Sequence, residues 1–151
     1  MTKERGWKLL KKSRVLVGSP ICQKPEILKA FLNSMRSLKQ ERISVDYIFV
    51  DDNKDTASSQ TLAEFLPEAS KVVILPGEAE QDYLCDEESH HWNDTLMHKV
   101  ADFKNTMIEY ALADQYDYLF FVDSDLVLHP NLLELLRSCK KDIVSEVFWT
   151  R

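Results

Sequence analysis

Short apolar segments alternate with segments of helical spacing along this chain, and this alternation limits the possible folds more than any other feature. RVLVGSPI at 14–21, VDYIFVDDN at 45–53 and KVVILPG at 71–77 are apolar enough for strands covered on both faces. YDYLFFVDSDL at 116–126 is a fourth such segment, and DIVSEVFWT at 142–150 is a fifth. Repeated β-α-β units with short links predict an α/β fold: a mainly parallel sheet between two helical layers, in a Rossmann-like three-layer α/β/α arrangement.

The segments between the strands carry helix signals. Proline is favoured in the first turn of a helix, and serine, threonine or aspartate favours the position just before it. Apolar residues follow these starts at the spacing of one helix face. The short second helix is expected to end at Leu66 and the last one at about Ser138. The expected starts are Pro25, Ser58 or Ser59, Asp94 or Thr95, and Pro130.

Composition restricts the classes of protein to which the chain can belong. Its 151 residues, 44% of them hydrophobic, suit one domain spanning 1–151. The formal net charge of −6 argues against a nucleic-acid partner bound through a general basic surface. The sequence has no apolar run of transmembrane length and no apolar signal-peptide core. The cysteines Cys22, Cys85 and Cys139 are odd in number and widely spaced, which predicts free thiols in a reducing, cytoplasmic setting.

Polar residues follow three of the predicted strands. The first strand ends in Ser19-Pro20, the second in Asp51-Asp52-Asn53, and the fourth in Asp123-Ser124-Asp125. In open α/β sheets, ligands bind beyond the carboxyl ends of the strands. We expect the fourth strand to lie beside the second, so that these carboxylates converge. Converging carboxylates indicate a bound metal ion or hydrogen bonds to ligand hydroxyls.

These motifs, taken in order, resemble the nucleotide-sugar-dependent glycosyltransferases of the GT-A fold, nearest to the family 2 type. The matching segments are VLVGSPI, IFVDDNKDTASSQTL and YLFFVDSDLVLHPNLLELL, and the last contains the DxD motif followed by a proline-led helix. DFKNTMIEYAL is a weaker match, in which Lys104-Asn105 stands at the place of the family's Arg-Asn pair. The resemblance covers most of the chain and implies a donor-binding, GT-A nucleotide-binding half.

The resemblance implies a divalent metal ion, Mn²⁺ or Mg²⁺, at the DxD motif. Asp125 would be the main ligand, and Asp123 would contact ribose or metal-bound water. A divalent ion can bridge a diphosphate and neutralise charge as the glycosidic bond breaks. The implied partner is a nucleotide-diphosphate sugar, with UDP- and GDP-sugars as the expected donors.

The other implied contacts concern the nucleotide. Asp51 or Asp52 would accept hydrogen bonds from the base or ribose. The loop at Ser19-Pro20-Ile21 would pack along the nucleoside. Lys104, and less firmly Lys99, would meet the base or the phosphates.

The acceptor half of such an enzyme is missing from the sequence, because only 26 residues follow Asp125. In the family, the carboxylate that serves as general base comes later, so no catalytic residue is assigned and the acceptor is unknown. We therefore expect the chain to be either a fragment of a longer enzyme, truncated after its nucleotide-binding half, or a natural short relative that binds nucleotide without full activity. Without a positioned proton acceptor, this chain alone is expected to transfer sugar weakly or not at all.

Other interpretations of the same residues stay open. Asp123-Ser124-Asp125-Leu126-Val127 also fits the DxDx[TV] pattern of haloacid-dehalogenase-like phosphatases, although there the motif ends the first strand. A nucleotidyltransferase would favour a glycine-rich loop, and GSPICQKP contains only Gly18. A non-catalytic nucleotide-binding module is a further alternative. A zinc site at Cys85, His90, His91 and His98 fits no standard ligand spacing.

Overall fold

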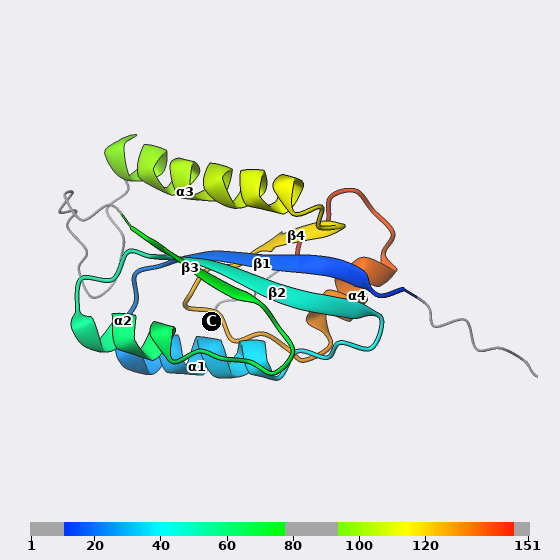
Figure 1. Cartoon of the computed structure of the whole chain (residues 1–151), viewed down its shortest axis with the longest axis horizontal. Helices are drawn as coiled ribbons and strands as arrows, with labels where there is room; N and C mark the ends of the chain where they lie inside the picture. Colours follow the sequence, from blue (N-terminus) through cyan, green and yellow to red (C-terminus); the bar gives the residue numbers. More distant parts are fainter. Residues whose placement is uncertain (1–10, 78–93, 147–151) are drawn as a thin grey trace, which may run out of the picture.

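The computed structural model describes residues 11–77 and 94–146, which form a sheet with helices on both faces (Figure 1). The strands are β1 (Ser13–Ile21), β2 (Ile43–Asp51), β3 (Val72–Pro76) and β4 (Tyr118–Phe121). The helices are α1 (Pro25–Arg36), α2 (Thr56–Ala63), α3 (Asp94–Ala113) and α4 (Leu132–Ser138).

The described strands are all parallel and lie in the order β3-β2-β1-β4. The sheet and its two helical layers confirm the predicted three-layer α/β/α, Rossmann-like fold. The expectation that the fourth strand lies beside the second is wrong, because β1 separates β2 from β4. The chain returns over α3 to the far side of β1. The chain therefore adds β2 and β3 on one side of β1 and β4 on the other. The boundary between β1 and β4 is the topological switch point of the sheet.

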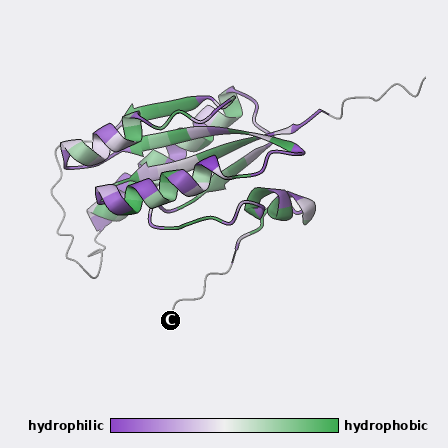
Figure 2. Ribbon diagram, turned by 90° about the horizontal axis from the view of Figure 1, so that it is seen from below, coloured by the Kyte–Doolittle hydropathy of each residue, from purple (hydrophilic) through white to green (hydrophobic). Residues whose placement is uncertain are grey.

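Two apolar cores lie on opposite faces of the sheet. One joins β1 and β2 to α1, α2 and α4, with Phe31, Tyr47, Phe49 and Phe65 packed together at its centre. The other joins the opposite faces of β1 and β2 to Phe103, Met107 and Ala111 of α3. Figure 2 shows the hydropathy of each residue: the strands are mainly hydrophobic, and the helices carry both hydrophobic and hydrophilic residues. Burial on both faces explains why the strand segments are almost continuously apolar.

The helices begin close to where the sequence predicts. Pro25 occupies the first turn of α1, as expected. The predicted cap of α2 is wrong, since Asp55 and neither Ser58 nor Ser59 stands before that helix. The Asp55 carboxylate accepts a 2.8 Å hydrogen bond from the Ser58 backbone N–H. An aspartate at this position satisfies an amide that the helix itself leaves without a partner.

The predicted fifth strand is not formed in the described residues 142–146, and 147–150 lie outside the described ranges. Lys140 adopts a φ of 51°, which turns the chain sharply after α4. Beyond that turn Ile143 is 93% exposed, so the segment does not pair with the edge of β4. An apolar pattern predicts a strand only if a neighbouring strand supplies hydrogen bonds, and here none does.

Among the helices that the structure describes, none combines the length and the apolar character that a bilayer crossing requires.

Candidate functional site

The carboxyl ends of β1, β2 and β4 form one edge of the sheet. In the strand register, Ile21 of β1 is level with Asp51 of β2, and Gly18 is level with Phe121, the last residue of β4. The Val122 backbone N–H still donates to the Gly18 carbonyl at 3.2 Å. Asp123 and Asp125 therefore follow the sheet edge directly, across the switch point from the end of β1.

The loop after β1 is tied to the loop after β2. The Asp52 backbone N–H donates to the Ile21 carbonyl at 2.8 Å, and the Gln23 backbone N–H donates to Asn53 Oδ1 at 2.9 Å. The Ser58 hydroxyl donates to the Gln23 carbonyl at 2.7 Å. These bonds give the edge a fixed shape before any ligand arrives.

Of the predicted nucleoside loop, Ser19 and Ile21 are fully buried and Pro20 is partly exposed. The Ser19 hydroxyl donates to the Pro20 carbonyl at 3.2 Å. Ile21 belongs to the core that packs against α1 and α2. The proline therefore offers the accessible side-chain surface of this loop.

Asp51 organises the turn after β2. Its Oδ1 atom accepts from Asn53 Nδ2 at 2.7 Å, from the Asn53 backbone N–H at 3.2 Å and from the Ser59 hydroxyl at 3.2 Å. An aspartate that binds the backbone two residues ahead is typical of a turn. This geometry assigns Asp51 a structural role at the site edge.

Asp52 forms an ion pair with Lys99 of α3. Lys99 Nζ lies 2.7 Å from Asp52 Oδ1, and the two side chains are 4% and 11% exposed. Lys99 Nζ also lies 5.6 Å from the centroid of the Phe103 ring. The sequence suggested Lys99 only weakly as a functional residue and gave no indication of its partner, because the two positions are far apart along the chain.

Asp123 and Asp125 lie in a turn immediately after β4, and both are exposed, whereas Ser124 between them is buried. The Asp123 carbonyl accepts from the Leu126 N–H at 3.3 Å, which closes the turn. No described residue donates a hydrogen bond to either carboxylate. Two carboxylates on one turn, each with open acceptor oxygens, suit a hard divalent cation that keeps waters and phosphate oxygens as its other ligands. The residues present therefore fit such an ion.

Lys104 lies near the same turn. Its Nζ atom is 5.7 Å from the centroid of the Phe121 ring, and Lys104 and Asp123 both line a cavity of about 570 Å³ along β4. The structure thus places Lys104 and Asp123 on one cavity, and it separately pairs Asp52 with Lys99.

Neither the DxD turn nor any other described part of the chain gathers three metal-binding side chains. Within residues 11–77 and 94–146, no group of three or more histidine, cysteine or acidic side chains is placed to hold a metal ion. Cys85, His90 and His91 lie outside the described ranges, and His98 is exposed on α3. His129 accepts the Asn131 backbone N–H at Nδ1, 3.2 Å away, just before α4.

The Asp55 carboxyl has a perturbed pKa beside the site. The Ser58 side chain, and then the Ser58 backbone N–H, lower the pKa of this carboxyl below its ordinary value. The Asp55 carboxyl that caps α2 is therefore held in its ionised form. Its negative charge also interacts favourably with the positive end of the helix dipole.

Comparison with known proteins decides the family. The sequence model described as glycosyltransferase family 25, N-terminal domain, matches residues 12–151. The chain belongs to this glycosyltransferase family. The predicted resemblance to a glycosyltransferase is thus confirmed. The predicted likeness to family 2 in particular is not confirmed, because the matching model describes family 25. No curated protein matches the chain.

Proposed function

We propose that this glycosyltransferase-family chain binds a nucleotide-diphosphate sugar at the carboxyl edge of its sheet. The observation that carries the proposal is the pair of exposed carboxylates, Asp123 and Asp125, next to the switch point between β1 and β4. Ligands of open α/β sheets bind at this place. Family membership supplies the reaction class, transfer of a sugar from a donor to an acceptor.

The DxD turn would hold Mn²⁺ or Mg²⁺, with Asp125 as the main ligand and Asp123 turned to ribose or to a water on the ion. When bound, such an ion neutralises charge on the diphosphate leaving group. Short aspartate side chains on a turn closed by the Leu126 N–H hold their oxygens close to the rigid strand end. Lys104, on the same cavity, would place an ammonium group near the phosphates.

The edge of β2 would bind the nucleoside. Asp52 carries one oxygen in its ion pair with Lys99, and its second oxygen can accept a hydrogen bond from a base or ribose. Asp51 uses Oδ1 for the turn after β2, so its share of binding would fall to Oδ2. Pro20, partly exposed at the end of β1, would pack along the nucleoside.

The placement of the motif favours this function over the phosphatase. In haloacid-dehalogenase-like enzymes the nucleophilic aspartate ends the first strand. Here the first strand is β1, which ends in Ser19-Pro20-Ile21, and the DxD turn follows β4. The family match to a glycosyltransferase agrees with this distinction.

Calorimetric titration tests the proposal. UDP, GDP, CDP and TDP are each added to the protein, with Mn²⁺ and with EDTA in its place. We expect one nucleotide to bind only with Mn²⁺, and Asp125→Ala to abolish that binding. Asp102→Ala is the matched control, since Asp102 is an exposed aspartate on α3 that does not line the cavity beside the turn. Binding that ignores the metal, or no binding of any nucleotide, would sink the assignment.

A further inference from the structure

A second pocket lies at the opposite edge of the sheet, where the strands begin. It has a volume of about 490 Å³ and is bounded by the start of β2, by Tyr118 at the start of β4 and by α4. We call it the amino-edge pocket and define it by Lys39, Arg42, Tyr118, Glu134, Arg137 and Lys140. It shares Tyr118 and Arg137 with the cavity along β4, but none of its lining residues belongs to the DxD turn, which follows the other end of β4.

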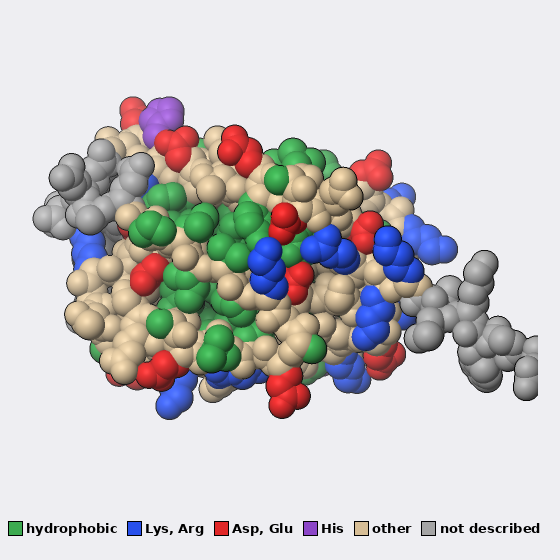
Figure 3. Space-filling view, viewed as in Figure 1, with side chains coloured by type: hydrophobic (Ala, Val, Ile, Leu, Met, Phe, Trp, Pro, Cys, Tyr) green, Lys and Arg blue, Asp and Glu red, His purple; other side chains and the backbone are tan. Residues whose placement is uncertain are grey.

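The amino-edge pocket is cationic in an acidic protein. Lys39, Arg42, Arg137 and Lys140 line it, against two carboxylates, Glu41 and Glu134. The whole chain carries a net charge of −6, so the sign of the charge is locally reversed. Figure 3 shows lysine and arginine side chains gathered toward the end of the molecule at which β1 begins. A concave site lined by one sign of charge concentrates ligands of the opposite sign.

The cations of the pocket are not neutralised by the acids beside them. None of the four forms an ion pair with a carboxylate of the described residues. Glu134 is engaged differently: its Oε1 atom accepts the backbone N–H of Arg42 at 2.7 Å. Four cationic groups therefore remain able to bind an anion at this edge.

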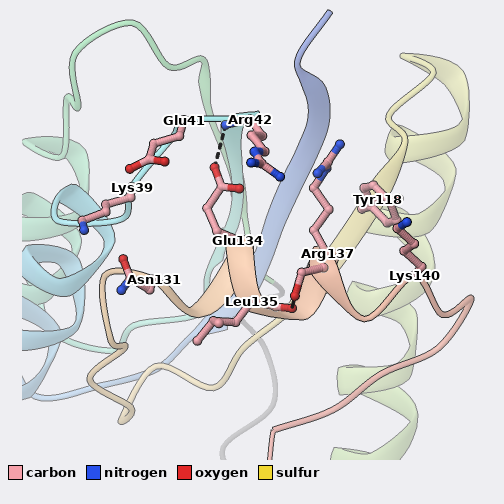
Figure 4. Close-up of a pocket in the computed structure, with 10 residues that line it drawn as sticks. Lys39, Glu41, Arg42, Tyr118, Asn131, Glu134, Leu135, Arg137 and Lys140 are labelled. Carbon is pink, nitrogen blue, oxygen red and sulfur yellow. Dashed lines mark hydrogen bonds between the residues drawn. The ribbon is translucent and has the colours of Figure 1, made fainter. Parts of the chain in front are cut away.

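Hydrogen bonds hold the walls of the pocket in place. Arg137 Nε donates to the Ser13 hydroxyl at 3.2 Å, which fixes the arginine stem against the start of β1. The Lys39 backbone N–H donates to the Pro130 carbonyl at 2.9 Å, which joins the segment before β2 to the segment before α4. Figure 4 shows Arg42 and Arg137 on either side of the start of β1 in this view, with Glu134 bonded to Arg42 and Lys140 beside Tyr118. Little ordering is left for a ligand to impose on these walls.

We propose that the amino-edge pocket binds a small molecule that carries a phosphate group. Arginine guanidinium groups present paired N–H donors that match phosphate oxygens, and Lys140 adds a point charge. The ring of Tyr118, 43% exposed, offers a flat surface for the uncharged part of such a ligand. A concave site of this size suits a small molecule and not a flat membrane surface.

Titration with inorganic pyrophosphate tests this site. The titration is done in EDTA, so that a metal-dependent donor site takes no part. We expect saturable binding, weakened roughly tenfold by Arg42→Gln because a charge-assisted hydrogen bond is lost. Arg42 uses only its backbone N–H to bind Glu134, so the substitution leaves that bond in place. Lys140→Gln, an exposed position, is a second variant that should also weaken binding while keeping the fold.

Two further variants make the test specific. Lys29→Gln removes the same charge from the exposed face of α1 and should leave pyrophosphate affinity unchanged. Glu134→Gln keeps an acceptor for Arg42 but removes a negative charge, and should tighten binding about threefold. No saturable binding to the parent protein would overturn the proposal. So would equal losses in the Arg42 and Lys29 variants, or weaker binding by Glu134→Gln.

Discussion

Lys99 Nζ lies 2.7 Å from Asp52 Oδ1, and this contact ties the first half of α3 to the carboxyl end of β2. The two side chains are almost removed from water, with 4% and 11% of their surfaces exposed. A charge in that setting depends on its partner, since it has lost most of its hydration. The ion pair therefore sets the position of α3 over the edge of the sheet that we propose as the donor site.

Replacing one member of this pair should destabilise the fold. Lys99→Met leaves the Asp52 carboxylate without its ammonium partner, and we expect a loss of about 3 kcal/mol in the free energy of unfolding. Asp52→Asn should cost a similar amount. The double variant Lys99→Met with Asp52→Asn should cost less than the sum, because neither charge is then left alone. Urea unfolding of all three variants measures the difference.

The exposed pair between Lys71 and Asp114 is the control for this cycle. Lys71 Nζ lies 3.1 Å from Asp114 Oδ2, but these side chains are 55% and 40% exposed. Lys71→Met should change stability far less than Lys99→Met, since water already screens that pair. Equal losses at the two lysines would show that burial does not govern the Asp52 contact.

Gly77 and Gly18 should respond differently to alanine. A Cβ atom at Gly77 would lie 2.7 Å from the Asp51 carbonyl oxygen and 2.8 Å from the Asp52 Cα atom, both parts of the backbone. At Gly18 it would lie 2.8 Å from Met107 Sδ, on a flexible side chain. Backbone cannot move aside as a methionine can, so we expect a loss of about 3 kcal/mol for Gly77→Ala and about 1 kcal/mol for Gly18→Ala.

Thermal unfolding of the two alanine variants checks this order. Gly77→Ala should also weaken nucleotide binding, because it displaces the end of β2 that carries Asp52. Gly18→Ala should leave that edge in place. A larger loss of stability at Gly18 than at Gly77 would contradict the argument.

The cap of α2 should make stability depend on acid pH. Ser58 holds the pKa of Asp55 below its ordinary value, so the carboxyl binds fewer protons in the folded chain than in the unfolded chain. The stabilisation is thus complete above the ordinary pKa of about 4 and is lost as the pH falls through the lower, folded value. We expect Asp55→Ala to unfold at a lower temperature than the parent at neutral pH, with the gap closing below pH ~4.

Asp55→Asn separates charge from capping in this experiment. Its amide oxygen can still accept the Ser58 N–H, so it should retain part of the stabilisation. What it retains should not vary with acid pH, because an amide does not titrate there. A gap between Asp55→Ala and the parent that persists unchanged in acid would contradict the assigned cause.

The helices and most of the strands could be predicted from the sequence, because the pattern of apolar residues in each segment reflects which of its faces are buried. Phe49 and Leu16 lie on strands whose two faces are both covered, and such strands are apolar throughout. The residues of a strand do not indicate which strands lie beside it. The predicted contact between the second and fourth strands was wrong for that reason. The segment around Ile143 shows the same limit, since its apolar residues find no strand to pair with.

The candidate site was predicted in part. Asp123 and Asp125 were proposed as site residues because carboxylates after an apolar strand are unusual. The pairing of Asp52 with Lys99 was not predicted, because it joins the turn after β2 to helix α3, which follows β3 in the chain. The capping role of Asp55 was missed in favour of nearby serines, although aspartate caps helices equally well.

Lys104 offers a test of the donor site that leaves the fold intact. Its side chain is partly exposed, and its Nζ atom lies 5.7 Å from the Phe121 ring centroid, on the cavity that Asp123 also lines. If its ammonium group meets the phosphates of the donor, Lys104→Gln should weaken nucleotide-diphosphate binding roughly tenfold in the presence of Mn²⁺. The melting temperature should stay near that of the parent, because no described carboxylate pairs with this lysine. Lys29→Gln carries the same loss of charge at a distant, exposed position and should bind as the parent does. Equal affinities for the Lys104 variant and the parent would show that Lys104 is not part of the site. The assignment of Asp125 is tested separately, by Asp125→Ala.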